Sequence, residues 1–137
     1  MTKLSQITAS PNPPAYNDQF VGVTAADNDV LFSTEQVMAA PPNVQSGPSY
    51  YLALTDFAGT VEMTNSSANT VTIVPWAIVP FPIGTLVTII QNGVGQTSMV
   101  AGPGVTLRAP FGLASQGQYH FITVQQRAID EWYVWAT

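Results

Sequence analysis

The stretch His120–Trp135 (HFITVQQRAIDEWYVW) alternates apolar and polar residues over His120–Gln125, ahead of the pair Asp130-Glu131, and is apolar throughout Trp132–Trp135 after it. A two-residue period is that of a β-strand, whose successive side chains point to opposite faces of a sheet. The acidic pair stands where a hairpin turn is expected. In Trp132–Trp135 the alternation makes both faces apolar. One face fits a domain core, and we expect a second surface to cover the other.

The same kind of pattern extends back from this stretch to Ser49. Short runs rich in β-branched and aromatic residues are separated by Gly, Asn and Pro, which is typical of strands and turns. The strands predicted are Tyr50–Leu54, Thr60–Thr64, Thr70–Val74, Leu86–Gln91, Gln96–Ala101, Val105–Arg108, Tyr119–Gln125 and Trp132–Ala136. Eight short strands predict an all-β fold, a small β-sandwich or barrel.

The chain before Ser49 has a different composition. Residues 1–18 hold Pro11, Pro13 and Pro14 and predict an extended arm, because proline fixes φ and removes a backbone donor. Two short strands are expected within 19–24 and 30–32.

One short helix is expected after these strands. A capping box at Ser33–Gln36 begins it, and it covers about 34–40 before Pro41-Pro42 ends it. Pro41–Pro48 has the composition of a linker. We therefore predict an N-terminal arm and attachment segment at 1–48 and a β-domain at 49–137.

Charge is scarce along the whole chain. Charged residues make up 8% and apolar residues 46%, with three basic side chains against eight acidic ones and a net charge of −5. A typical soluble domain carries about 25% charged residues. The surface is therefore expected to be neutral-polar or covered by other copies. Three cations do not provide a phosphate-binding patch, which argues against nucleic-acid binding.

Other classes are excluded by what the sequence lacks. No apolar run reaches the roughly 20 residues of a membrane-spanning helix, so we expect no membrane partner. The first residues have no apolar secretion-signal core. Zero cysteines exclude disulfides, thiolate metal ligands and cysteine nucleophiles.

No constellation of residues predicts catalysis. His120 is the only histidine, and no Gly-x-Ser-x-Gly elbow accompanies it. The acidic residues within 27–29 are read as a turn, since the glycine and the glutamate of a calcium loop are missing after them. The pair 130–131 is read as a hairpin turn, since it precedes a strand. The glycines of 93–95 and 102–104 open no helix and precede no Gly-Lys-Thr, so they are read as turn residues. We expect no enzyme activity, no cofactor and no metal site.

One part of the chain resembles a known group of proteins. The stretch from Pro80 to Gln96 (PFPIGTLVTIIQNGVGQ) is followed by Ala101–Leu107 (AGPGVTL), by Gly117-Gln118-Tyr119 and by Asp130–Val134 (DEWYV). This succession resembles a β-rich module that recurs in tailed-bacteriophage virion proteins, among them fibre, head-decoration and minor structural proteins. The likeness covers about residues 50–137. The start of the chain, Thr2–Ser10, is similar to the leader that attaches such proteins to the virion.

The resemblance implies a non-enzymatic structural protein of a tailed-phage virion, made in the host cytoplasm. We expect a capsid decoration, cement or head-fibre protein that assembles as a homotrimer and binds the major capsid or other virion proteins. Alternatives are a tail-fibre or collar component, or a carbohydrate-binding receptor module. The candidate interface residues are Tyr119, Trp132, Tyr133, Trp135, Phe81 and Trp76, and the candidate attachment residues are Leu4, Ile7, Phe20 and Val37.

Overall fold

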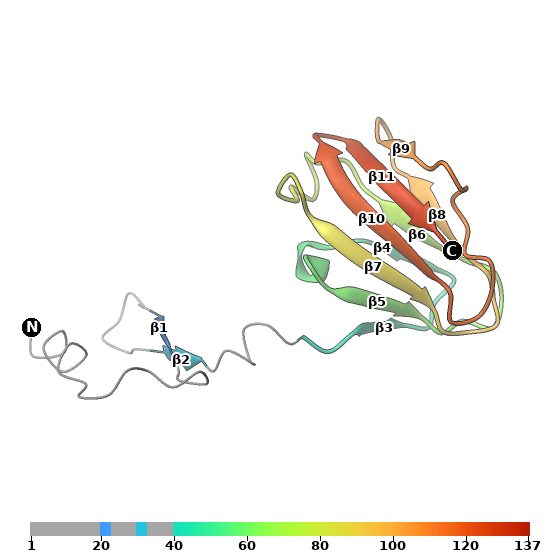
Figure 1. The fold of residues 1–137 in the computed structure, drawn as a ribbon, viewed down its shortest axis with the longest axis horizontal. Helices are drawn as coiled ribbons and strands as arrows, with labels where there is room; N and C mark the ends of the chain where they lie inside the picture. The colour runs from blue at the N-terminus through green and yellow to red at the C-terminus, as the bar shows by residue number, and fades with distance from the viewer. Residues whose placement is uncertain (1–19, 23–29, 33–39) are drawn as a thin grey trace, which may run out of the picture. The chain divides into compact units, whose positions relative to one another are not determined.

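The computed structural model describes residues 20–22, 30–32 and 40–137 of the chain. The chain divides into two compact units, Met1–Ala40 and Pro41–Thr137 (Figure 1). In the first unit, β1 (Phe20–Gly22) pairs antiparallel with β2 (Val30–Phe32). Both strands were expected from the sequence. The predicted helix at 34–40 and the candidates Leu4, Ile7 and Val37 lie outside the described residues, apart from Ala40, which is in no helix.

The second unit is all-β, as the sequence predicts. Strand Leu86–Gln91 has the predicted bounds, and the other predicted strands are found within a few residues of theirs. The strands are β3 (Asn43–Gln45), β4 (Ser49–Tyr51), β5 (Thr60–Met63), β6 (Asn69–Ile73), β7 (Leu86–Gln91), β8 (Thr97–Ala101), β9 (Thr106–Arg108), β10 (Phe121–Ala128) and β11 (Glu131–Ala136). A short 3₁₀ helix, η1 (Leu54–Asp56), follows β4.

These strands form two sheets between which the chain passes back and forth. A six-stranded sheet has the order β3-β5-β7-β10-β11-β9, and a three-stranded sheet has the order β4-β6-β8. From β3 to β8 each strand lies in the other sheet from the one before it, and β5, β6, β7 and β8 each pair in parallel with the strand two places earlier. We call two consecutive strands of this series, one in each sheet, a rung. Rung 1 is β3–β4, rung 2 is β5–β6 and rung 3 is β7–β8.

The turns that join the two strands of each rung lie close against one another. The Gly95 N–H donates to Asn65 O at 3.2 Å, and Asn65 Nδ2 donates to Ser46 O at 2.9 Å, so three successive turns are hydrogen-bonded. A Cβ atom on Gly95 would lie 2.0 Å from Ser67 O, and one on Gly93 would lie 2.2 Å from Asn65 O. The glycines of this turn therefore permit the stacking of rung 3 on rung 2.

The end of the fold beyond rung 3 is closed by the rest of the chain. Strand β10 pairs antiparallel with β7 and with β11, and β9 pairs in parallel with β11. The free side of β8 is covered by the segment 113–115, where Met99 N–H donates to Leu113 O and Ser115 N–H donates to Thr97 O. Ser115 also donates through Oγ to the buried Gln91 Oε1.

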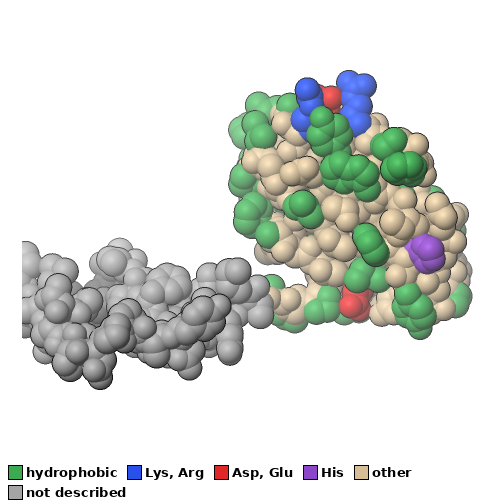
Figure 2. Space-filling view, viewed as in Figure 1, with side chains coloured by type: hydrophobic (Ala, Val, Ile, Leu, Met, Phe, Trp, Pro, Cys, Tyr) green, Lys and Arg blue, Asp and Glu red, His purple; other side chains and the backbone are tan. Residues whose placement is uncertain are grey.

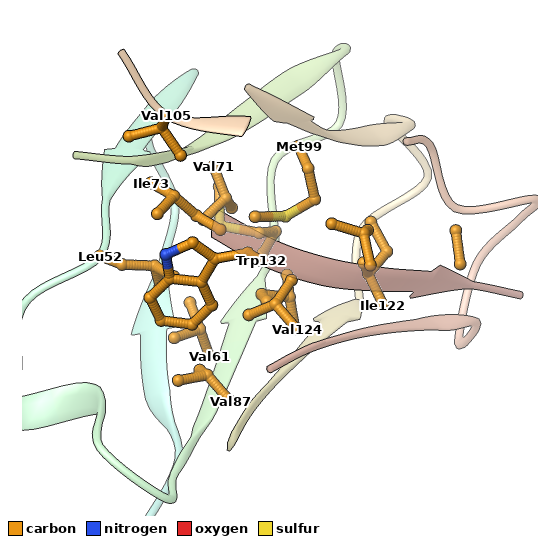
Figure 3. Close-up of a cluster of buried hydrophobic side chains, with 14 of the residues drawn as sticks. Leu52, Val61, Val71, Ile73, Val87, Met99, Val105, Ile122, Val124 and Trp132 are labelled. Carbon is orange, nitrogen blue, oxygen red and sulfur yellow. The ribbon is translucent and has the colours of Figure 1, made fainter. Parts of the chain in front are cut away.

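The hydrophobic core lies between the two sheets (Figure 3). The alternate residues of each central strand point into it, among them Val61, Val71, Val87, Ile122 and Val124. Trp132 extends from β11 into this core and is 2% exposed. Its ring meets that of Phe81 edge-on, with centroids 5.5 Å apart and planes at 86°.

The division of the chain differs from the expected boundary between residues 48 and 49. The second unit begins at Pro41, and the segment expected to be a linker contributes β3 to the six-stranded sheet. Pro41 and Pro42 precede this strand and Pro48 follows it. Proline is tolerated beside an edge strand, because a missing N–H on the unpaired side breaks no ladder hydrogen bond.

Rung 1 contains a buried acidic group, Asp56, which is 2% exposed. Its carboxylate accepts hydrogen bonds from Asn43 Nδ2 at 2.8 Å, Tyr50 OH at 2.8 Å and Ala53 N–H at 2.9 Å. Asn43 Nδ2 also donates to the Tyr50 oxygen at 2.7 Å. These bonds tie β3, β4 and η1 together. A buried carboxylate is tolerated when donors satisfy its oxygens in this way.

The Asp56 network predicts a loss of stability at high pH. Burial, together with the hydrogen bond to Asp56, raises the pKa of Tyr50 to about 12 from its ordinary value of 10.0. Stability from the neutral phenol is complete below pH 10 and is lost as pH rises through about 12, since only the unfolded chain ionises readily in that window. Urea unfolding from pH 8 to 12 should show a steeper loss in wild type than in Tyr50→Phe. Equal slopes would contradict the assignment.

Candidate interaction surface

The outer face of the six-stranded sheet carries apolar side chains that no described residue covers. Along β11 the side chains alternate, so that Trp132 and Val134 are buried while Tyr133 is half-buried and Trp135 is 36% exposed. This confirms that both faces of the strand are apolar. The Tyr133 and Trp135 rings lie 5.6 Å apart on the outer face, tilted by 40°.

Neighbouring strands extend this apolar region. Directly paired residues share a face of a sheet. Gln125 pairs with both Tyr133 and Leu86, and Phe121 pairs with Ile90. We call this outer region the apolar stripe, with members Leu86, Ile90, Phe121, Tyr133 and Trp135. Between them lie Thr88, Thr123 and Gln125. Uncharged hydroxyl and amide groups therefore separate the apolar side chains.

Charged groups lie at both ends of this face: Glu62 pairs directly with Ile90, and the others gather around Tyr133. Glu131 accepts from Arg108 Nε at 2.9 Å and from Arg127 at 2.7 Å, and the Arg127 guanidinium lies 6.0 Å from the centre of the Tyr133 ring. The hydrogen bond from Arg108 holds the pKa of Glu131 below its usual range. In Figure 2 two basic groups with an acidic one between them occupy one corner, a second acidic group lies near the opposite end, and hydrophobic side chains are spread over the face between.

The six interface candidates do not form one surface. Phe81 and Trp132 are 1% and 2% exposed and lie in the core, so neither side chain forms part of a surface. Trp76 is part-exposed on the loop after β6, where its Nε1 donates to Phe81 O at 3.1 Å. Tyr119 is exposed before β10. Of the six, only Tyr133 and Trp135 are brought together on the outer face of the sheet.

Tyr119 has an unusual backbone conformation. Its φ is 66°, in the left-handed region that bulky residues rarely adopt, and its side chain is 70% exposed. The Tyr119 N–H donates to Gln91 O at 2.6 Å, and Gln91 N–H donates to His120 O at 3.0 Å. This pair of bonds fixes the turn that leads into β10 and holds the phenol outward.

The structure brings no catalytic set together in the part of the chain that it describes. Within 40–137, no hydrogen bond joins the His120 ring to a carboxylate or a hydroxyl group. Among the described residues there is also no group of three or more His, Cys, Asp or Glu side chains able to hold a metal ion. In the same residues, no helix has the length and apolar character needed to span a membrane.

Rung 1 carries a second exposed apolar region, which was not predicted from the sequence. Val44 on β3, Tyr51 on β4, and Leu54 and Phe57 at η1 are each about half exposed or more. The Tyr50-Tyr51 pair was a signal of an extended segment with one side chain inward and one outward. Strand β3 was missed because the prolines on both sides of it, Pro41-Pro42 and Pro48, are typical of a linker.

Comparison of the chain with models of protein families, with curated proteins and with solved structures gives no match.

Proposed function

We propose that this chain is a non-enzymatic structural protein of a tailed-phage virion, a capsid decoration, cement or head-fibre protein. Its copies join in threes through the apolar stripe, and its first 48 residues bind the major capsid or another virion protein. The single observation that carries the proposal is the apolar stripe itself. Exposed apolar side chains rimmed by polar groups are typical of protein–protein contacts, and in the stripe these side chains are interleaved with Thr88, Thr123 and Gln125.

The composition supports the same proposal. Aromatic residues are enriched in the centres of interfaces and charged residues are depleted there. The stripe itself holds no charged residue, and its charged neighbours lie beside Ile90, at Glu62, and beside Tyr133. The order of sequence motifs that resembles the phage module falls within the second unit.

We also take the two-sheet core to be a sandwich rather than a closed barrel, because no ladder joins the sheets in the described residues.

The mass of the assembled protein tests the proposal. Sedimentation equilibrium of the full chain at micromolar concentration should give a multiple of three times the 14.6 kDa chain mass. Trp135→Glu places a charge in the stripe and should weaken the threefold contact by at least about 100-fold, since burying an unpaired charge costs several kcal/mol. Ile78→Glu adds the same charge at an exposed loop position and should leave the mass unchanged.

Two results would contradict this function. One is a wild-type chain that sediments as a monomer at micromolar concentration. The other is an equal effect of Trp135→Glu and Ile78→Glu, which would show that added charge alone disturbs the assembly.

One observation favours a different function, that of a carbohydrate-binding receptor module. Strained non-glycine residues concentrate at functional sites, and the exposed phenol of Tyr119 is held out by such a conformation. Polysaccharide binding that disappears in Tyr119→Ala, with the mass of the assembly unchanged, would support this second candidate.

A further inference from the structure

Rung 1 leaves both sheets open on the same side. Strand β3 is the last strand of the six-stranded sheet, and β4 is the last strand of the three-stranded sheet (Figure 1). Among the described residues, β3 pairs with β5 alone and β4 with β6 alone. We call this pair of free edges the rung-1 end. An open edge presents unpaired backbone groups on which another strand can form hydrogen bonds.

The hydrogen bonds already made show which backbone groups are free. Gln45 O accepts from Thr64 N–H, so Gln45 faces β5. Pro48 O accepts from Thr70 N–H, and Leu52 N–H donates to Thr72 O, so both face β6. Because successive residues of a strand direct their backbone groups to opposite sides, the N–H and C=O groups of the residues between these point away from the domain. The residues concerned are Val44, Ser49 and Tyr51.

The two edge strands of the rung-1 end carry no charge. From Pro41 to Val61 the one charged side chain is Asp56, which is buried and accepts three hydrogen bonds. The half-buried Glu62 lies one strand further in, paired with Val44. The exposed large side chains here are apolar or aromatic. The chain as a whole has a net charge of −5, so two copies repel one another in general. At this end no like charges face each other.

We propose that a second copy of this chain docks on the rung-1 end, head to head. A partner that fills both edges must supply two strands at once, separated by the distance between the two sheets. Another copy of this chain carries the same two edge strands at the same separation, so its rung-1 end meets this requirement. A two-fold axis through the end pairs β3 with β3 and β4 with β4, both antiparallel, and Val44 N–H and C=O then bond reciprocally to the partner's Val44.

The opposite end of the domain cannot pair with the rung-1 end of another copy, so copies do not stack head to tail. Strand β10 covers β7, and segment 113–115 covers β8, so the far end offers no pair of edges to a rung-1 end. Pairing is therefore isologous and closes after two copies, which prevents a fibre. Pro42 and Pro48 flank β3 and confine the new ladder to a few residues.

This contact is separate from the threefold contact of the proposed function. The apolar stripe lies on the face of the six-stranded sheet, whereas the rung-1 end lies at its edge. If both contacts form, the full chain assembles as six copies. Loss of the end contact then leaves three, and loss of the stripe contact leaves two.

The test uses the full chain with Val44→Lys and Tyr51→Lys combined. Lysine on an edge strand opposes pairing, and both side chains are already exposed, so the fold should persist by circular dichroism. Sedimentation equilibrium should show the assembly mass halved. The matched control, Ile78→Lys with Val94→Lys, adds the same charge at exposed positions outside the strands and should keep the wild-type mass.

Hydrogen exchange of the amides of Val44 and Tyr51 gives a second measurement. In wild type their protection should fall on dilution and should be lost in the lysine variant.

Two outcomes would overturn the inference. One is an unchanged mass in the lysine variant while Trp135→Glu still lowers it. The other is protection that does not depend on concentration, which would show that the chain's own first unit covers the end. A threefold contact that fails with the end contact intact would leave a dimer, so the two proposals fail separately.

Discussion

Replacing Gly95 with alanine is expected to lower the free energy of unfolding by at least about 3 kcal/mol, or to prevent folding altogether. The added Cβ would lie 2.0 Å from Ser67 O and 2.3 Å from Ser67 C, which are backbone atoms of the rung below. No side chain can rotate away to make room. Rungs 2 and 3 would have to separate locally, which breaks hydrogen bonds such as that from Gly95 N–H to Asn65 O. Urea unfolding followed by tryptophan fluorescence measures the effect.

The matched control for this variant is Gly47→Ala in the corresponding turn of rung 1. No described rung lies beyond it, and the nearest atom to an added Cβ is Ser49 O at 3.7 Å, an ordinary contact. We expect a change within about 0.5 kcal/mol. If Gly47→Ala and Gly95→Ala lower the free energy of unfolding equally, close stacking of the turns is not the reason that residue 95 is glycine.

The second large effect is expected from Trp132→Ala, at about 3–5 kcal/mol of lost stability. Trp132 is 2% exposed, and its indole packs edge-on against the Phe81 ring. Removal of the indole leaves a cavity in the centre of the core, next to side chains held by two sheets. Measurement of the unfolding midpoint in urea, with the slope unchanged, gives the difference directly.

Trp135→Ala is the matched control, since it removes the same side chain from the same strand on the opposite face. Trp135 is 36% exposed and contacts Tyr133, so truncation should cost under about 1 kcal/mol in the isolated chain. Dilution below the assembly range separates this effect from association. A Trp135→Ala variant as unstable as Trp132→Ala would contradict the assignment of the two faces.

The alternation of residues predicted most strands because it depends only on which face of a sheet each side chain occupies. Period two alone places Trp132 and Val134 on one face and Tyr133 and Trp135 on the other. It does not say which face is buried, which is why Trp132 was named among the interface candidates. Alternation does not say which strand is the neighbour. The parallel pairing of β5 with β7 and of β6 with β8 was therefore not predicted. The turn glycines were correctly read as turn residues, but their role in stacking one turn on another needs the pairing first.

The surface was harder to predict than the strands. Phe81 stands between two prolines, which is typical of an exposed loop, yet its ring fills the core against Trp132. Period-two reasoning gives no inward direction to a residue outside a strand. The strand β3 was missed for a related reason, since proline marks a linker and an edge strand equally well.

The step from rung 2 to rung 3 spans the same number of residues in both sheets. Val61 and its partner Ile89 are as far apart in the sequence as Thr70 and its partner Ser98. A domain built in this manner grows along a single axis, and each added layer needs only its immediate neighbours. Duplication or loss of one such layer changes the height of the domain without altering its two ends. Evolution can thereby adjust how far a protein of this design projects from whatever it is anchored to.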